Sequence, residues 1–220
     1  MSNTEQPAVS EYRCGSFTLR LRYVKKEDGY TYVADAYLKP VRLEEVSIIA
    51  SFFADKRIFW NLGEDGSLKL LLNLRVENPQ RFEEDFMSFL TENIPTLKTL
   101  FSLNSLVQPL LDDGWLVHTG LATLEASKTI PGHGRLEIRV TKTGPTRASL
   151  QATLVLFPES LAQALTFTRR LREAGYNVKD RFPVLRADKV LGTFPVCDLT
   201  EKIRGLYEEA TRLCASHEGQ

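Results

Sequence analysis

The stretch Leu19-Arg-Leu-Arg-Tyr-Val-Lys25 decides how the chain folds, because apolar and polar residues alternate along it. Such alternation predicts a β-strand with one face in a core and the other in water. Asp28-Gly29 follows as a turn, and residues 30–38 are typical of a returning strand. Pro40 then precedes an amphipathic segment, Arg42–Lys56, which predicts a helix. We call this order of strand, turn, strand, proline and helix a hairpin–helix unit.

The hairpin–helix unit occurs twice more in the chain. Leu136-Glu-Ile-Arg-Val-Thr-Lys142 matches the first strand, and Pro158 stands before the helix of that copy. The middle copy runs from Ile58 to Leu90, and its Asn78-Pro79 pair is typical of a helix start. Because hairpins followed by helices are common, chance recurrence stays an alternative to duplication. We predict an α+β fold of two similar lobes, each with antiparallel β-hairpins packed on amphipathic helices.

The Asp112-Asp113-Gly114 turn is the expected boundary between the lobes. It gives a first lobe at residues 14–113 and a second at 114–220. Residues 1–13 begin with a polar stretch, and we expect them to form a disordered leader.

Charge and hydropathy exclude several classes of partner. The 220 residues contain 28 Lys and Arg against 28 Asp and Glu, so no global field attracts nucleic acid or anionic lipid. The longest apolar runs are strand-sized, whereas a membrane span needs about 20 residues. The polar N-terminal stretch resembles no signal peptide, and three cysteines do not make a disulfide framework. We therefore expect a cytoplasmic protein without membrane partners, and the overall charge gives no support for nucleic-acid binding, although a local basic patch stays open.

Two predicted helices carry more apolar residues than a one-sided surface helix needs. Phe52 widens the apolar face of the helix at Arg42–Lys56. The segment Thr96–Leu111 is nearly all apolar, contains no Asp, Glu or Arg, and is predicted as one helix that Pro109 weakens near its end. Such surfaces are either buried between the lobes or covered by a protein partner or a second copy. The candidate binding residues are Phe52, Leu100, Phe101, Leu103 and Leu106.

Catalytic motifs are absent from the sequence. It has no phosphate-binding loop and no Cys or His pair at metal-ligand spacing, so we predict no cofactor and no metal. The one candidate catalytic residue is His133, which stands between Gly132 and Gly134. Glycines let the backbone approach a ligand, and imidazole transfers protons near neutral pH. An ordinary loop is the alternative, and we favour a protein that is not an enzyme.

Basic residues alternate along the predicted strands, and tyrosines lie nearby in the sequence. Arg20, Arg22, Arg139 and Lys142 are spaced for strand faces, and such faces can bind single-stranded nucleic acid when tyrosines stack on the bases. A solvated sheet face with cross-strand pairs explains the same pattern, and we favour it.

The middle copy also resembles a known group of proteins. Phe59-Trp-Asn-Leu62, the strand Leu68–Val76 after Glu64-Asp-Gly66, and Arg81-Phe-Glu-Glu-Asp-Phe86 resemble the YbjN-like and type III secretion chaperone-like proteins. The resemblance implies small α+β units and a non-enzymatic helper that binds proteins through sheet or helix faces. The leading prediction is thus a protein-binding or chaperone-like adaptor. The alternatives are a small enzyme with a site near residues 128–134 and a single-stranded nucleic-acid binder.

Overall fold

The computed structural model describes residues 8–54, 56–179 and 182–215. The chain divides into two compact units, Met1–Leu100 and Phe101–Gln220, which we call unit 1 and unit 2. This division lies earlier in the chain than the expected turn at Asp112–Gly114. Both units combine an antiparallel sheet with helices, which confirms the predicted α+β class with two lobes.

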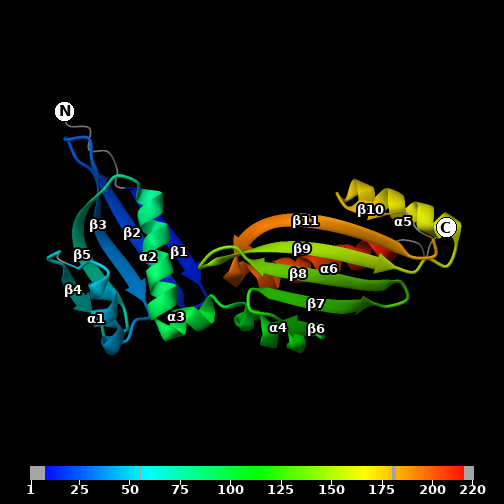
Figure 1. Cartoon of the computed structure of the whole chain (residues 1–220), viewed down its shortest axis with the longest axis horizontal. Coiled ribbons are helices and arrows are strands. Elements are labelled where there is room, and N and C mark those ends of the chain that lie inside the picture. The colour runs from blue at the N-terminus through cyan, green and yellow to red at the C-terminus, as the bar shows by residue number, and fades with distance from the viewer. Residues whose placement is uncertain (1–7, 55, 180–181, 216–220) are drawn as a thin grey trace. The chain divides into compact units, whose positions relative to one another are not determined.

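Unit 1 is a five-stranded antiparallel sheet with two main helices on one face (Figure 1). The strands follow the order β1-β2-β3-β5-β4. Residues of β2 alternate between the two faces of the sheet as predicted: Leu19 and Leu21 are fully buried, whereas Arg20 and Arg22 are exposed. The elements are β1 (Ala8–Cys14), β2 (Phe17–Lys25), β3 (Thr31–Lys39), α1 (Leu43–Ser51), β4 (Phe59–Leu62), β5 (Leu68–Val76), α2 (Pro79–Asn93) and α3 (Pro95–Leu100).

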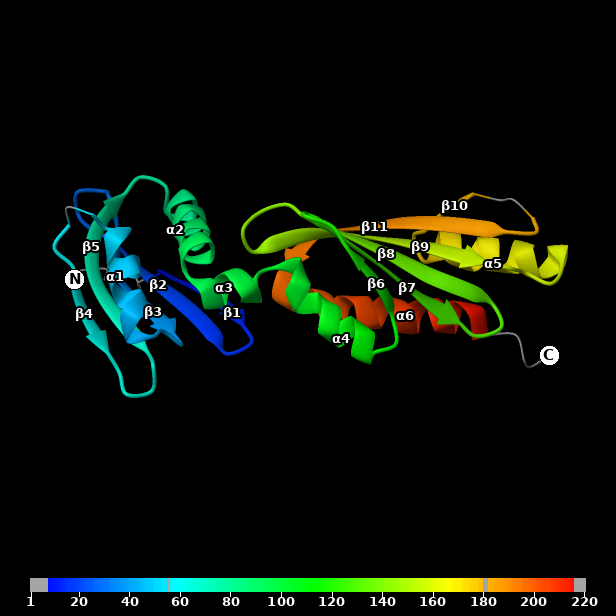
Figure 2. The same ribbon diagram turned by 60° about the horizontal axis from the view of Figure 1, so that its bottom comes forward.

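Unit 2 is a six-stranded antiparallel sheet in the order β10-β11-β9-β8-β7-β6. Its longer helices, α5 and α6, lie on one face of the sheet (Figure 2) and contribute Phe167, Leu171, Ile203 and Cys214 to a single core. The elements are η1 (Leu103–Leu106), α4 (Val107–Asp112), β6 (Leu116–Thr119), β7 (Thr123–Ile130), β8 (Gly134–Lys142), β9 (Arg147–Leu156), α5 (Leu161–Glu173), β10 (Asn177–Lys179), β11 (Leu185–Pro195), η2 (Val196–Asp198) and α6 (Leu199–Ala215).

The two units share one order of connection. In unit 1, β1-β2-β3 is followed by α1, by β4 and β5 with β5 beside β3, and by α2. In unit 2, β7-β8-β9 is followed by α5, by β10 and β11 with β11 beside β9, and by α6. All three predicted hairpin–helix units are therefore present. β6 is an addition beside β7. That the units arose by duplication stays a prediction.

The prediction of a disordered leader at residues 1–13 is wrong for residues 8–13. Ala8–Cys14 form β1, which pairs with β2 from Ala8 opposite Tyr23 to Cys14 opposite Phe17. Pairing with a neighbouring strand provides partners for backbone groups that a free terminus would leave in water. Residues 1–7 of the predicted leader lie outside the described residues.

The single helix predicted at Thr96–Leu111 is also wrong. The segment forms three short pieces, α3, η1 and α4. The Ser102 hydroxyl accepts a hydrogen bond from the Asn104 amide at 3.2 Å and thereby starts a new turn. Serine competes for backbone groups in this way and so interrupts a continuous helix.

Candidate functional site

The strand β4 ends the sheet of unit 1 and exposes large apolar side chains. Within the described strands, β4 pairs only with β5, and Phe59 lies opposite Leu71. Phe59 is 71% exposed, Leu71 59% and Trp60 50%. We call Phe59, Trp60 and Leu71 the β4 edge patch. Edge strands with apolar side chains are templates for pairing with another chain.

Side chains of the β4 edge patch lie on both faces of the sheet. One cross-strand row runs from Val9 through Arg22, Asp35 and Leu71 to Phe59, on the face that the helices leave open. Arg22 and Asp35 form an ion pair in the middle of this row. Trp60 lies opposite the buried Leu70 and therefore on the helix-covered face. An added strand, whose side chains alternate between faces, would contact Phe59 on one face and Trp60 on the other.

The turn that joins β4 to β5 is held by Asp65. Its carboxylate accepts hydrogen bonds from the Ser67 amide at 3.1 Å and from Lys39 Nζ at 2.8 Å. The hydrogen bond from Lys39, followed by those from Ser67, holds the pKa of Asp65 well below its usual range. Gly66 has a φ of +72°, a conformation that favours glycine in this turn. The turn therefore fixes the register that places Phe59 opposite Leu71.

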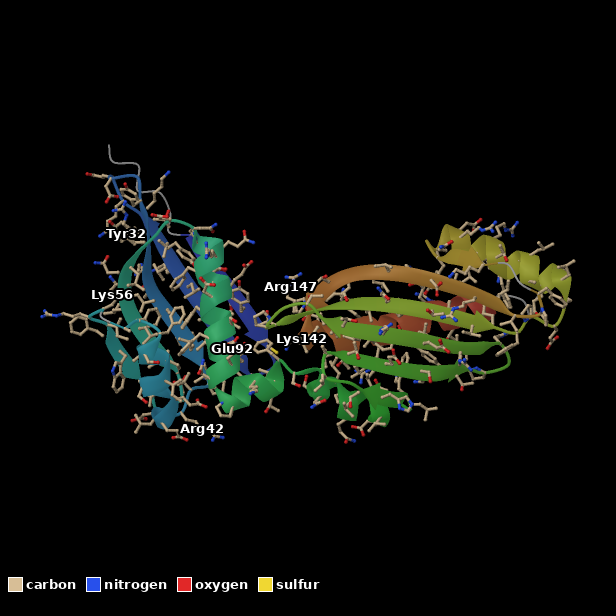
Figure 3. All side chains as sticks on the ribbon, in the orientation of Figure 1. Tyr32, Arg42, Lys56, Glu92, Lys142 and Arg147 are labelled. Atoms are coloured by element: carbon tan, nitrogen blue, oxygen red, sulfur yellow. The ribbon has the colours of Figure 1, made fainter. Side chains whose placement is uncertain are left out.

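Basic side chains surround the β4 edge patch. Lys56 and Arg57 are exposed just before β4, and Lys69 is exposed on β5 opposite Asn61. Figure 3 shows the side chains of this part of unit 1, with Lys56 labelled. The described acids near the patch are Glu64, Asp65, which pairs with Lys39, and Asp35, which pairs with Arg22. The patch thus combines apolar area with exposed basic side chains.

The corresponding strand of unit 2 is charged instead of apolar. β10 occupies the same place in its sheet as β4, next to β11 at the end of the order. Its Lys179 pairs with Asp188 on β11 at 3.1 Å, and Arg186 lies 3.7 Å from the same carboxylate. Lysine on an edge strand discourages pairing with other chains, so β10 is protected where β4 is not.

Phe52, a predicted binding residue, belongs to a cluster of five phenylalanines in unit 1. The centroid of its ring lies 4.9 Å from that of Phe86, 5.1 Å from those of Phe53 and Phe89, and 6.0 Å from that of Phe82. Phe53 and Phe86 are buried, whereas Phe52 is half-buried. Phe52 therefore joins the end of α1 to α2 and keeps part of its ring accessible.

The other predicted binding residues lie mainly inside the fold. Leu103 and Leu106 belong to the core of unit 2, and Phe101 is 4% exposed. Leu100 is half-buried at the end of α3. Because the short pieces replace the predicted helix, their apolar residues point into a core. Other edge strands also expose an apolar side chain, Val9 of β1 and Leu116 of β6, but in β4 two large aromatic side chains are exposed in succession, so the β4 edge patch is the candidate surface.

The sequence pattern did not predict this patch, although Phe59 and Trp60 belong to the segment Phe59–Leu62 that resembles the YbjN-like proteins. The adjacent aromatic pair is a local signal for a strand with apolar side chains on both faces. Only the sheet order, which depends on distant pairings, shows that β4 lies at an edge.

His133, the candidate catalytic residue, has a structural role in the turn between β7 and β8. Its backbone amide donates to Ile130 O at 3.1 Å, and its carbonyl accepts from the Phe157 amide at 2.8 Å. Its half-buried ring packs edge-on against Phe167, with ring centroids 5.9 Å apart. None of the ion pairs and side-chain hydrogen bonds found among the described residues brings a carboxylate to this imidazole.

The three arginines of the strand faces are paired with acids, and Lys142 with a backbone carbonyl. Arg20 lies 3.2 Å from Glu11, and Arg139 lies 3.5 Å from Glu125 across the strands. The Lys142 ammonium donates to the Phe101 carbonyl. A hollow of about 590 Å³ on the open face of the unit 2 sheet is lined by such pairs. These pairs fit the solvated-face interpretation that we favoured, since ion-paired guanidinium groups are poorly available for phosphates.

In the described part of the chain, no group of three His, Cys, Asp or Glu side chains is arranged to hold a metal ion. The helices described here are all too short or too polar to cross a bilayer. No family model, curated protein or solved structure matches the chain.

Proposed function

We propose that the protein is a non-enzymatic protein-binding module whose partner adds an extended segment to β4. The observation that carries the proposal is the exposed Phe59–Leu71 pair on a four-residue edge strand. Strand addition gives affinity through main-chain hydrogen bonds and specificity through alternate side chains. Covering a phenylalanine or leucine side chain contributes about 1.5–3 kcal/mol before the costs of association.

The chemistry of the partner follows from the residues around the edge. Phe59 and Trp60 favour apolar side chains at successive positions of the added strand, one on each face. Lys56, Arg57 and Lys69 favour acidic residues beside them. We therefore propose an extended segment in which apolar and acidic residues are mixed.

The chaperone-like role and the resemblance to the YbjN-like proteins stay predictions. An exposed sheet edge is one way in which such a helper could hold a client protein. A second copy of the chain is the alternative occupant of β4. The cytoplasmic location also stays a prediction.

The proposal is tested by selecting short peptides from a random display library on the whole protein and measuring affinity by fluorescence anisotropy. We expect the double variant Phe59→Ser, Trp60→Ser to weaken the selected peptide at least about tenfold. Leu165→Ser is the matched control, because Leu165 is 64% exposed but belongs to the helix α5 of unit 2. Equal affinity in the double variant, or equal loss in the control, would reject β4 as the site.

A second measurement uses the two tryptophans. Trp60 is 50% exposed and Trp115 only 3%, so Trp60 is the one whose surroundings a ligand on β4 changes. We expect a blue shift of the emission on peptide binding, retained when Trp115 is replaced by Phe. Light scattering across a concentration range shows whether a second copy occupies the edge instead, which would make the module a homodimer.

A further inference from the structure

A hollow of about 640 Å³ lies in unit 1 between the start of β1, the paired ends of β2 and β3, and the first turns of α2. Its walls include Ala8, Val9, Thr31 and Pro79, and its charged groups are Glu83 and Lys25. The lining is mainly apolar around one half-buried carboxylate, that of Glu83. Apolar hollows with few convergent polar groups are the usual form of small-ligand sites.

Glu83 is held by three hydroxyl groups. Its Oε2 accepts from Ser10 Oγ at 3.0 Å and from the Tyr12 hydroxyl at 2.8 Å. Its Oε1 accepts from the Tyr23 hydroxyl at 2.8 Å. Tyr23 is 6% exposed, so this part of the arrangement is rigid. The position of the carboxylate is thus fixed before any ligand arrives, which lowers the cost of binding.

The hydrogen bonds leave Glu83 with unused capacity. An ionised carboxylate offers about four acceptor positions, and the hydroxyls take three of them. The vacant position belongs to Oε1, which among the described residues accepts from Tyr23 alone. Hydroxyl groups orient the carboxylate but bring no positive charge to it. A cationic N–H donor would supply both the fourth hydrogen bond and the missing charge.

We infer that the hollow beside Glu83 binds a primary ammonium group carried on an apolar chain. The ammonium donates to Glu83 Oε1, and the alkyl part covers Val9, Thr31 and Pro79. Lys25 lies on the wall of the same hollow, but its side chain is exposed and can turn its charge into water. The shared chemistry is an alkylammonium, from either a free amine or a lysine side chain.

The test is a calorimetric titration of the whole protein with hexylamine, hexanol and hexanoate. We expect hexylamine to bind at least about tenfold more tightly than hexanol, since a hydrogen bond between two charged groups is stronger than one from a neutral hydroxyl. Hexanoate should bind more weakly than hexanol. N-acetyl-lysine methylamide and its ε-acetylated form separate the lysine source from the free amine. Equal binding of hexylamine and hexanol would overturn the inference.

Two variants locate the site. Glu83→Gln should abolish the preference for hexylamine, whereas Glu84→Gln, an exposed neighbour on α2, should leave it unchanged. If Glu83→Gln fails to fold, Gln80→Trp fills the hollow while keeping the carboxylate, and it should abolish binding. Full binding by Gln80→Trp, or by a folded Glu83→Gln, would reject this hollow as the site.

Discussion

Units 1 and 2 connect their strands and helices in the same order, yet they end their sheets differently. In unit 1 the last strand, β4, exposes Phe59 and Trp60. In unit 2 the strand in that place, β10, has Lys179 paired with Asp188. Because the connectivity is the same, the difference comes from a few side chains. A sheet edge is therefore open or closed to partners by local chemistry on an unchanged frame.

A second difference concerns the long helix that follows β5 in unit 1 and the one that follows β11 in unit 2, which are α2 and α6. In unit 1, Glu83 on α2 accepts hydrogen bonds from the hydroxyl groups of β1 and β2. In unit 2, Glu209 on α6 forms an ion pair with Lys189 of β11 at 2.9 Å. The carboxylate of unit 2 already has its cation, whereas that of unit 1 leaves an acceptor position for a ligand.

The largest expected effect tests whether the units have equivalent cores. Phe86 in unit 1 is fully buried and Phe167 in unit 2 is 2% exposed. Each replacement by Ala should lower the free energy of unfolding by about 3–5 kcal/mol. Denaturant titration measures this loss, and Phe157→Ala, at 50% exposure, is the control. A loss below about 1 kcal/mol for either core variant would break the comparison.

Two buried tyrosines should respond in opposite ways to loss of the hydroxyl. Tyr23 donates to Glu83, so Tyr23→Phe should cost about 1.5–3 kcal/mol. The Tyr176 hydroxyl is buried without a hydrogen-bond partner in the described structure, so Tyr176→Phe should be neutral or stabilising. Thermal unfolding of both variants compares the signs directly. A destabilised Tyr176→Phe would point to an additional partner for that hydroxyl.

The same tyrosines predict sensitivity to alkaline pH. Burial raises the pKa of both phenols, and for Tyr23 the hydrogen bond to Glu83 adds to the effect. The folded pKa is thus above the unfolded value of about 10. The folded state holds the proton more firmly, so this stability is complete below pH 10 and is lost as the pH rises beyond it. Unfolding titrations between pH 8 and 12 should show a shallower decline in Tyr23→Phe than in the wild type. The exposed Tyr30→Phe is the control.

The smallest expected change in stability comes from exchanging the character of the two edges. Phe59→Lys gives β4 the charge of β10, and Lys179→Phe does the reverse. Both positions are exposed, so each change should alter the free energy of unfolding by less than about 0.5 kcal/mol. Light scattering should show less self-association for the first variant and more for the second. No difference between them would mean that the edges do not control association.

The sequence predicted the local elements better than their positions in the sheets. The three hairpin–helix units are all present, because alternation and proline-led helix starts are local properties. The helix predicted at Thr96–Leu111 failed because composition does not show where a serine interrupts a helix. The β4 edge patch escaped prediction because exposure of Phe59 depends on the order of all five strands. The Glu83 site likewise joins residues more than 50 positions apart in the chain, such as Ser10 and Tyr23 with Glu83.

The reaction rate of the Cys214 thiol can report on local opening in unit 2. Its free thiol, on the core-facing side of α6, is 1% exposed, and burial raises its pKa to about 11. A protonated, enclosed thiol does not react with alkylating reagents until the chain around it opens. Because Cys214 lies in the last turn of α6, the rate of its alkylation measures how often that turn opens. A ligand that stabilises this part of unit 2 would slow the rate about tenfold for each ~1.4 kcal/mol that it adds to the opening free energy.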